Sequence, residues 1–364
     1  MTTHGVHARR RVAALLLALA VLLALPVAPA RAEIKFPPGF SVQVYVTGAG
    51  FDSAGGRGAA GIPATSTLAF DRSGVLYLAR TGRRYTPGDV EDVWPIYRIP
   101  MGGARVTSAT ESQYFYGPPL PNPQIAAIRD GRDLFVTTFD RDRKIGVLYR
   151  IVDGRAELFA GGTPPKGGYP LLVQPEGAAV DAAGHVYVAD RERGVVLRFD
   201  PSARLLDARY AMVPRPRVLV MGEADELWVG CDAAAEAPWQ PGPGEVWLVA
   251  PRQSPRMVLR GPIPAGMGLG PAGHLFVADR HAGRVFALRR DGTRIEFAHF
   301  GDGDTPRTVA FAPVTDATRK AGIAGDLFIV RIAGGAWPVN EVIRVSGPFE
   351  QYLRDQPSKD QPSR

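Results

Sequence analysis

Polar and charged residues occupy two fixed positions in a sequence motif that the chain repeats six times. The first place follows an anchor residue that opens a strand-like run, and it holds Ser66, Gln124, Glu176, Arg217, Ala265 and Arg307. The second place ends the following run, and it holds Arg80, Thr138, Asp190, Cys231, Asp279 and Arg331. Carboxylates and amides could bind a polar ligand or a hard cation. Arginines could hold an anion with paired hydrogen bonds.

The six copies indicate how these residues are positioned. Their anchors are Thr65, Pro123, Pro175, Pro216, Pro264 and Pro306, and successive anchors lie 41 to 58 residues apart. Each copy continues with two further strand-like runs, which are bounded by glycine, aspartate or proline. Four short strands per period are typical of a β-propeller blade. The sequence therefore predicts an all-β fold, a six-bladed β-propeller with four antiparallel strands per blade, over residues 33–354.

One additional strand-like segment, residues 40–48, precedes the first copy. We expect it to pair with the last blade and close the ring, which removes an exposed sheet edge.

The antiparallel order brings both sets of residues to one face of the propeller. The loop before the first strand and the turn between the second and third strands meet at the mouth of the central channel. The longest connections on this face carry Trp94, Trp239 and Trp337. Loops above a rigid ring often form a ligand site. The candidate ligand-binding residues are Arg80, Gln124, Glu176, Asp190, Arg217, Asp279, Arg307, Arg331, Trp94 and Trp337.

Structural roles compete with ligand binding at several of these positions. Asp190 and Asp279 could close tight turns with side-chain hydrogen bonds, and the tryptophans could pack against their own loops. Glu176 lies before a strand, where no tight turn needs a side-chain hydrogen bond. Arg80, Arg307 and Arg331 belong to neighbouring blades, so a counter-charge must offset them: Asp279, solvent or a ligand.

Residues 1–32 have the pattern of a secretory signal peptide. Three arginines precede an apolar run that ends in Ala30-Arg31-Ala32, and the run is too short for a membrane anchor. We therefore expect a secreted or periplasmic protein without a membrane span. Without the leader the chain has 39 basic and 36 acidic residues, a net charge of +3, which argues against a nucleic-acid partner.

Two further features bear on stability. Cys231 is the single cysteine, so no internal disulfide forms and a large apolar core must hold the fold. Residues 355–364, which are polar and self-repeating, predict a disordered tail.

The repeats resemble known families. "PEGAAVDAAGHVYVADRERGVVLRFD" and "GHLFVADRHAGRVFALRRDG" resemble NHL repeats. The six copies together resemble the regucalcin and gluconolactonase superfamily of six-bladed propellers. The ends, "FPPGFSVQVYVTG" and "GDLFIVRIAGGAWPVNEVIRV", are similar to soluble quinoprotein sugar and sorbosone dehydrogenases.

Each resemblance implies a different cofactor. Regucalcin-like lactonases hold a divalent metal such as calcium, and Glu176 matches their glutamate ligand, whereas the other ligand positions differ. Quinoprotein dehydrogenases hold pyrroloquinoline quinone with basic residues and use a histidine base. This chain has Arg331-Ile332 where their last blade carries Glu-His.

Three classes of function remain open at this stage. We expect an exported, monomeric propeller that binds a polar or anionic small molecule, or a peptide, at the channel mouth. The alternatives are an enzyme, either a quinoprotein-type sugar or aldehyde dehydrogenase or a metal-dependent lactonase, and an interaction scaffold.

Overall fold

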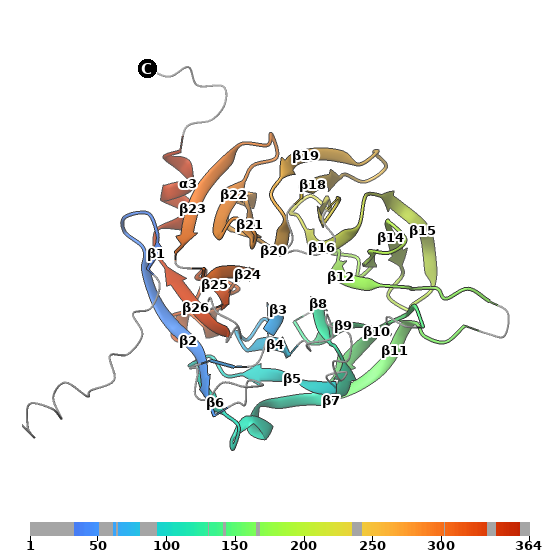
Figure 1. The fold of residues 1–364 in the computed structure, drawn as a ribbon, viewed down its shortest axis with the longest axis horizontal. Helices are drawn as coiled ribbons and strands as arrows, with labels where there is room; N and C mark the ends of the chain where they lie inside the picture. Colours follow the sequence, from blue (N-terminus) through green and yellow to red (C-terminus); the bar gives the residue numbers. More distant parts are fainter. Residues whose placement is uncertain are drawn as a thin grey trace, which may run out of the picture. The chain divides into compact units, whose positions relative to one another are not determined.

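The computed structural model contains six sheets, each built on four antiparallel strands, arranged around a central axis (Figure 1). It describes residues 33–50, 61–62, 65–80, 93–129, 131–140, 143–164, 168–234, 242–301, 303–332 and 340–356. Residues Ile34–Arg364 form one compact unit. This confirms the all-β, six-bladed propeller with four antiparallel strands per blade.

The first three blades follow the chain in order. In each, strand a is innermost and strands b, c and d follow outward. Blade one consists of β3 (Thr65–Phe70), β4 (Leu76–Arg80), β5 (Val93–Ile99) and β7 (Phe115–Pro121). Blade two consists of β8 (Gln124–Arg129), β9 (Asp133–Asp140), β10 (Ile145–Val152) and β11 (Arg155–Gly161). Blade three consists of β12 (Pro175–Val180), β13 (Val186–Asp190), β14 (Val195–Phe199) and β15 (Leu205–Met212).

The remaining blades use the N-terminal segment as well. Blade four consists of β16 (Pro216–Met221), β17 (Leu227–Cys231), β18 (Gly244–Val249) and β19 (Arg256–Gly261). Blade five consists of β20 (Pro264–Leu269), β21 (Leu275–Asp279), β22 (Arg284–Leu288), β23 (Arg294–Phe300) and β1 (Ile34–Lys35). Blade six consists of β24 (Thr305–Phe311), β25 (Leu327–Ile332), β26 (Asn340–Ser346), β2 (Ser41–Ala49) and β6 (Ala104–Thr107).

Short helices fill some of the connections. They are η1 (Glu111–Tyr114), η2 (Pro271–Gly273), α2 (Asp316–Lys320) and α3 (Phe349–Arg354). Among the described residues, no helix has the length and apolar character needed to cross a bilayer.

Strand b carries the core of every blade. Each strand b contains a buried aromatic residue, and these residues include Tyr77, Phe135, Tyr187, Trp228, Phe276 and Phe328. Their neighbours come from adjacent sheets, as where Tyr187 and Ala189 of blade three pack with Leu219 and Val229 of blade four. Both faces of each sheet are therefore buried, which explains why these strands show apolar runs rather than strict alternation.

The N-terminal segment closes the ring. β2 pairs antiparallel with β26, from Ser41 opposite Ser346 to Val46 opposite Val342. The outer side of β2 pairs in parallel with β6, which belongs to the connection inside blade one. This confirms that residues 40–48 complete the last blade. The same segment also extends blade five, because β1 pairs with β23.

Aromatic rings seal the closure. Phe40, which directly precedes β2, lies 5.0 Å from Phe297 of blade five, 4.9 Å from Phe349 and 5.7 Å from Tyr352, measured between ring centroids. Phe349 and Tyr352 belong to α3, so the chain's two terminal segments pack together over blades five and six. Edge-to-face pairs of this kind add about 0.5–1.5 kcal/mol each beyond their burial.

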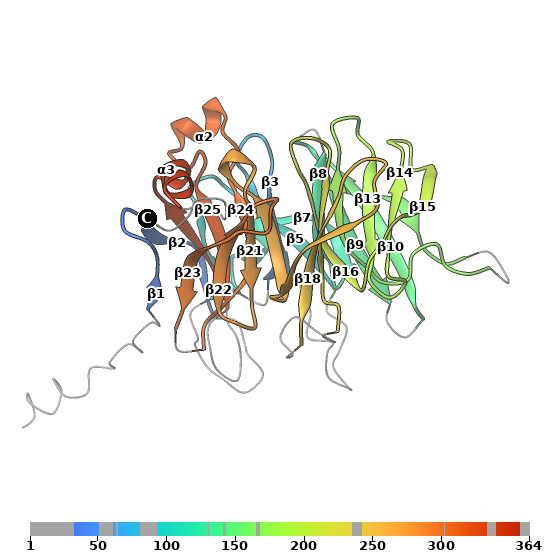
Figure 2. The same cartoon turned by 90° about the horizontal axis from the view of Figure 1, so that it is seen from above.

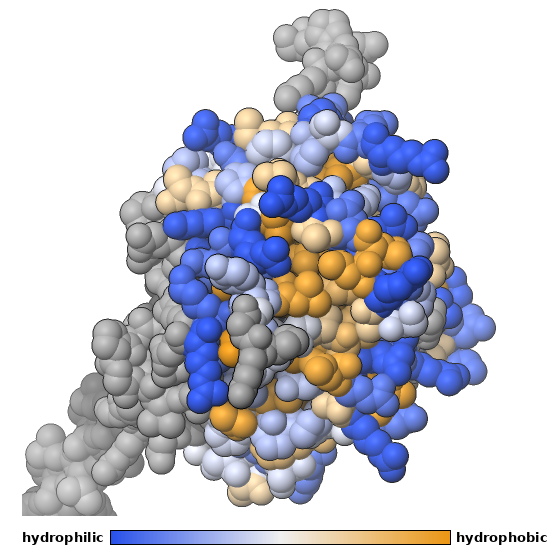
Figure 3. Space-filling model, turned by 90° about the vertical axis from the view of Figure 1, so that its right-hand side faces the viewer, coloured by the Kyte–Doolittle hydropathy of each residue, from blue (hydrophilic) through white to orange (hydrophobic). Residues whose placement is uncertain are grey.

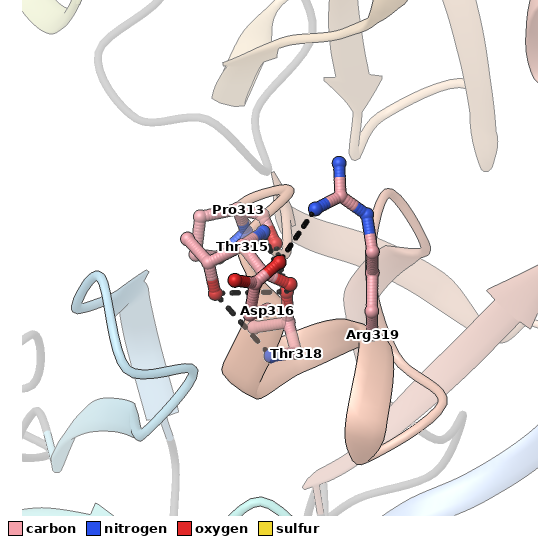
Figure 4. Close-up of polar contacts among 5 residues, drawn as sticks. All are labelled: Pro313, Thr315, Asp316, Thr318 and Arg319. Atoms are coloured by element: carbon pink, nitrogen blue, oxygen red, sulfur yellow. Dashed lines mark hydrogen bonds and ion pairs between the residues drawn. The ribbon is translucent and has the colours of Figure 1, made fainter.

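The connection between strands a and b of blade six contains α2, which lies beyond the ends of these strands (Figure 2). Thr315 caps this helix, because its hydroxyl accepts a hydrogen bond from the Thr318 amide at 3.2 Å (Figure 4). The Thr318 hydroxyl donates to the Pro313 carbonyl at 2.6 Å, and Arg319 pairs with Asp316 at 3.0 Å. These contacts stabilise a helix too short to form alone.

The outer edges of blades two and three differ from those of blades five and six. Figure 3 looks onto the side that carries β11 and β15 and shows apolar residues gathered among charged ones. Exposed apolar side chains on these strands are Leu158, Leu205, Leu206 and Met212. No further strand covers either edge in the part of the chain that the structure describes. Register shifts between β14 and β15 make the β15 edge irregular, which disfavours pairing with another chain.

Ring closure by β2 makes a testable prediction. Val46 is fully buried in β2, whereas Val42 in the same strand is 47% exposed. We expect Val46→Ala to lower the free energy of unfolding by about 2 kcal/mol, and the matched Val42→Ala to change it by less than about 0.5 kcal/mol. Urea denaturation followed by fluorescence measures both. Equal effects of the two substitutions would show that packing of β2 into blade six does not support the ring.

Candidate functional site

Four residues of the first set share one backbone feature, a β-bulge at the start of the innermost strand. In blade three Pro175 pairs with Asp190 and Gly177 pairs with Ala189, so Glu176 is the extra residue. The same shift occurs in blades four to six, where the extra residues are Arg217, Ala265 and Arg307. In blade two the shift lies further along the strand, and Gln124 pairs with Thr137. Because bulges redirect the side chain that they carry, each of blades three to six presents one redirected side chain near the channel.

Close packing of neighbouring blades follows each bulge. A Cβ added to Gly177 would lie 2.5 Å from the carbonyl oxygen of Arg217 in blade four. Only glycine leaves room for the two inner strands to approach this closely. This approach brings the bulge residues of blades three and four near each other.

Glu176 is held by amide groups from two blades. Its Oε2 accepts from Gln124 Nε2 and its Oε1 from Gln174 Nε2, both at 2.7 Å. Its backbone carbonyl accepts from the Thr137 hydroxyl at 3.1 Å. The side chain is 5% exposed. The structure brings the candidates Gln124 and Glu176 together and adds Gln174, which precedes an anchor proline and gave no signal in the repeat alignment.

Asp190 binds the backbone that leads into its own blade. Its carboxylate accepts from the amides of Val173 at 2.8 Å, Gln174 at 3.2 Å and Arg193 at 3.4 Å. The side chain is fully buried. Asp190 therefore fixes the start of strand a and the following turn, which is the structural role considered for it.

Asp279 makes the equivalent contacts in blade five. It accepts from the Ala282 amide at 3.1 Å. Burial raises the pKa of Asp279, while hydrogen bonds from the backbone amides of Ala282 and Ile263 act in the opposite direction. Ile263 precedes its anchor proline just as Gln174 does. The shared "VAD" ending of copies three and five thus corresponds to a shared contact between strands a and b.

Arg217 lies in a buried cluster of charges between blades three and four. Arg217 Nε and Arg191 Nε both contact the Asp232 carboxylate, at 3.1 and 2.8 Å. Asp232 is fully buried, and both arginines are nearly so. Asp232 immediately follows the second-set residue Cys231, and its role was not recognised from the sequence.

Arg331 also has a carboxylate partner from the chain itself. Its Nε donates to Asp304 Oδ2 at 2.6 Å, and its Nη1 lies 3.7 Å from Glu341 Oε2. Glu341 in turn accepts from the Thr47 hydroxyl of the closing strand at 2.8 Å. The expected sources of counter-charge were Asp279, solvent or a ligand. The structure corrects this for Arg331, because Asp304 and Glu341 provide the negative charge.

The other candidates lie in different surroundings. Arg307 is 7% exposed, and Thr138 and Cys231 are also buried. Burial, followed by the nearby charges of Glu245 and Asp232, raises the pKa of the Cys231 thiol. The Arg80 side chain, Trp239 and Trp337 lie outside the described residues, so the structure does not place them.

Trp94 departs from the expected loop position. It lies in β5 opposite Leu120, half-buried, with its ring 6.2 Å from that of Phe115. Pro95 falls at a register shift between Trp94 and Ile96. A bulge tolerates proline within a strand because no ladder hydrogen bond is required there. Strand β5 therefore includes Trp94, which the sequence predicted to lie in a loop.

Two features of the described residues bear on ligand binding: their metal-ligating side chains and a surface pocket. The described residues contain no group of three or more histidine, cysteine, aspartate or glutamate side chains placed to hold a metal ion. A polar pocket of about 490 Å³ lies between blades four and five, at the opposite ends of the strands, where the a–b and c–d turns gather. Its lining includes Glu223, His274, Arg289 and Arg290.

The Asp232 cluster makes a prediction about stability. Asp232→Asn removes the negative charge between Arg191 and Arg217, and leaving buried charges without compensation costs roughly 3–5 kcal/mol. A control is Asp316→Asn, which breaks the exposed pair with Arg319 and should cost less than about 1 kcal/mol. Thermal and urea unfolding measure both. If Asp232→Asn is as mild as the control, the cluster does not hold blades three and four together.

Comparisons with known proteins agree with the fold. Residues 172–199 match the family model for the NHL repeat. The search of curated protein sequences found no match.

Solved structures give the same result over most of the chain. A gluconolactonase from Xanthomonas campestris is 15% identical with a TM-score of 0.57, covering 89% of this chain and 99% of that one. An auxiliary nutrient-binding protein from Bacteroides thetaiotaomicron is 11% identical with a TM-score of 0.53, covering 87% and 77%. A virginiamycin B lyase from Staphylococcus aureus is 13% identical with a TM-score of 0.48, covering 86% and 99%.

The gluconolactonase and the nutrient-binding protein share the fold with this chain, and at identities this low the activity must be inferred from the residues of the site. The fold, the repeats and the match at residues 172–199 together identify the chain as a six-bladed β-propeller that contains an NHL repeat.

Proposed function

We propose that this protein is an exported propeller that binds a polar small molecule rich in hydroxyl groups, such as a sugar, polyol or lactone, at the mouth of its channel. The observation that carries this proposal is Glu176. It is a carboxylate on a bulge of the innermost strand, and amides from Gln124 and Gln174 orient both of its oxygens. Each carboxylate oxygen can accept more than one hydrogen bond. Hydroxyl donors are therefore the complementary groups.

The arginines favour a neutral ligand over an anionic one. Arg217 and Arg331 are already paired with Asp232 and Asp304. An anion would have to compete with these carboxylates and would approach Glu176 against like charge. A neutral ligand leaves every pair intact.

The groups at the channel mouth fit a bound metal ion or quinone less well than a neutral ligand. Both Glu176 oxygens accept from amide groups, and a hard cation needs several free oxygen ligands. A tricarboxylate quinone would need the arginines that Asp232 and Asp304 engage. We therefore derive no reaction step through either group.

Export and a monomeric state complete the proposal. The basic start, apolar run and Ala30-Arg31-Ala32 ending of residues 1–32 support export. The first strand, β1, begins at Ile34, so cleavage after Ala32 would leave every strand of the propeller intact.

The gluconolactonase and the nutrient-binding protein among the solved structures share the fold at 15% and 11% identity. Their names make a sugar-related ligand a reasonable probe for this chain, and the shared fold alone does not assign one.

Ligand binding is tested by calorimetry with three sets of probes: neutral sugars and lactones, their carboxylate forms, and short peptides. We expect a neutral probe to bind and Glu176→Gln to weaken it at least about tenfold, because a charged acceptor is worth about 1.5–3 kcal/mol. Glu223→Gln, the same change on the opposite face, should leave binding unchanged.

The remaining arms discriminate between the alternatives. Binding of a carboxylate probe that Arg307→Ala abolishes, at a cost of about 2–5 kcal/mol, would establish an anion site instead. Binding of peptides alone would favour an interaction scaffold. Neutral-probe binding that survives Glu176→Gln would exclude Glu176 as the acceptor.

Calcium provides a separate test. We expect chelator-treated protein to show no binding of calcium in the micromolar range, because the described residues place no further carboxylates beside Glu176 to form a group of three or more metal ligands. Calorimetry with calcium chloride measures this directly. Micromolar affinity that disappears in Glu176→Gln would instead support a metal-dependent lactonase.

A further inference from the structure

The face opposite the channel mouth holds a contact between blade five and the C-terminal helix. Arg289, in the turn between strands c and d, donates from Nε to His274 Nε2 at 3.3 Å. Its Nη2 donates to the carbonyls of Leu353 at 3.0 Å and Gln356 at 3.1 Å. His274 follows η2, which packs against α3. One guanidinium group therefore joins a histidine to the end of α3.

This geometry requires a neutral histidine. A guanidinium group can only donate hydrogen bonds, so His274 Nε2 must accept and carries no proton. A proton added to Nε2 would place two donors and two positive charges against each other. Arg289 would then have to withdraw from His274, and its contacts with the α3 carbonyls would change with it.

The Arg289 contacts complete the hydrogen bonding of α3. This helix spans only Phe349–Arg354, and the last carbonyls of a helix have no partner within the helix. Its other side is held by the apolar packing of Phe349 and Leu353 in the core cluster of blades five and six. A cation at this end also compensates the negative pole of the helix. The helix in turn covers the ring closure, since Phe349 packs against Phe40 and Phe311 with centroids 4.9 and 5.1 Å apart.

The surroundings of His274 allow it to titrate. Its ring lines the polar pocket of about 490 Å³ together with Glu223, Arg290 and Asp291, so water reaches the site without unfolding.

Several charged groups near the His274 imidazole are paired with each other. Arg290 is paired with Glu226, and Asp291 accepts from the Thr293 amide at 2.7 Å. On α3, Glu350 and Arg354 lie 3.6 Å apart and pair with each other. Arg289 is thus the charged group that His274 contacts directly.

We propose that His274 and Arg289 form a pH-sensitive latch that holds α3 on the ring closure at neutral pH and releases it when the histidine is protonated. The latch is independent of ligand binding at the channel mouth. It gives an exported protein a response to the acidity of its surroundings, because histidine titrates in the range that such compartments span.

The direction of the effect follows from proton linkage. Burial lowers the pKa of His274 below its ordinary value of 6.5, and the charge of Arg289 acts in the same direction, whereas the backbone of Pro271 and Ala272 and the charge of Asp291 act against them. The unfolded or released state then binds a proton more readily than the latched state. The contribution of the latch to stability is fully present above 6.5 and is lost as the pH falls from that value through the pKa of the latched state.

Hydrogen exchange followed by mass spectrometry tests the latch on the whole protein, at about pH 7.5 and about pH 5, the range in which histidine titrates. Labelling times are scaled for the intrinsic exchange rate. We expect the protection of residues 349–356 to fall about tenfold at the lower pH, while the core strand β21 stays protected.

Two substitutions separate His274 from other titrating groups. His274→Gln keeps an acceptor for Arg289 and cannot be protonated, so residues 349–356 should stay protected at both pH values. His281→Gln, a matched change in the same blade, should behave like the wild type. Arg289→Ala should expose α3 at both pH values.

The outcomes are distinguishable. Equal protection of α3 at both pH values in the wild type would overturn the proposal. So would acid-induced loss of protection in His274→Gln, since another group would then be responsible. If a variant does not fold, an NMR titration of the wild type decides the matter: the imidazole of His274 and the amides of α3 must share one midpoint, and different midpoints would exclude the latch.

Discussion

Closure of the ring is the constraint on which the rest of the structure depends. Six blades form a propeller only if the last is joined to the first, and here β2 does so by pairing with β26 while accepting β6 from blade one. The join covers the outer sides of β26 and β2 and buries Val46. It also reaches the channel mouth, because Thr47 of β2 donates to Glu341, which lies 3.7 Å from Arg331.

Within the closed ring, a repeated backbone carries side chains that are not repeated. The bulge at the start of strand a recurs in blades three to six, yet it carries Glu176, Arg217, Ala265 or Arg307. By contrast, the aspartates that end strand b in blades three and five serve the backbone in the same way. Repetition therefore marks the contacts that build a blade, and divergence marks the positions available for function.

The sequence was informative where local pattern decides the structure. The anchors, the buried aromatic centres of strand b and the closing strand all follow from periodicity and from the need to cover edges. The partners of the arginines did not, because Asp232, Asp304 and Glu341 occupy three different places in their blades and share no offset in the repeat. Their pairing depends on how neighbouring blades meet, which one blade's sequence does not encode.

Trp94 illustrates the same limit at the level of one strand. Its long connection predicted a loop position, but β5 already includes Trp94, and a bulge accommodates Pro95 inside the strand. Gln174 was missed for a related reason: it lies outside every strand and becomes significant only through its contact with Glu176.

We propose that the channel mouth binds hydroxyl groups through Glu176 while its arginines stay paired with carboxylates of the chain. A crystal structure of the complex with the tightest-binding probe tests this proposal. We expect ligand hydroxyl oxygens within hydrogen-bonding distance of the Glu176 carboxylate and an intact contact between Arg331 and Asp304. A ligand whose anionic group replaces Asp304 as the partner of Arg331 would contradict it.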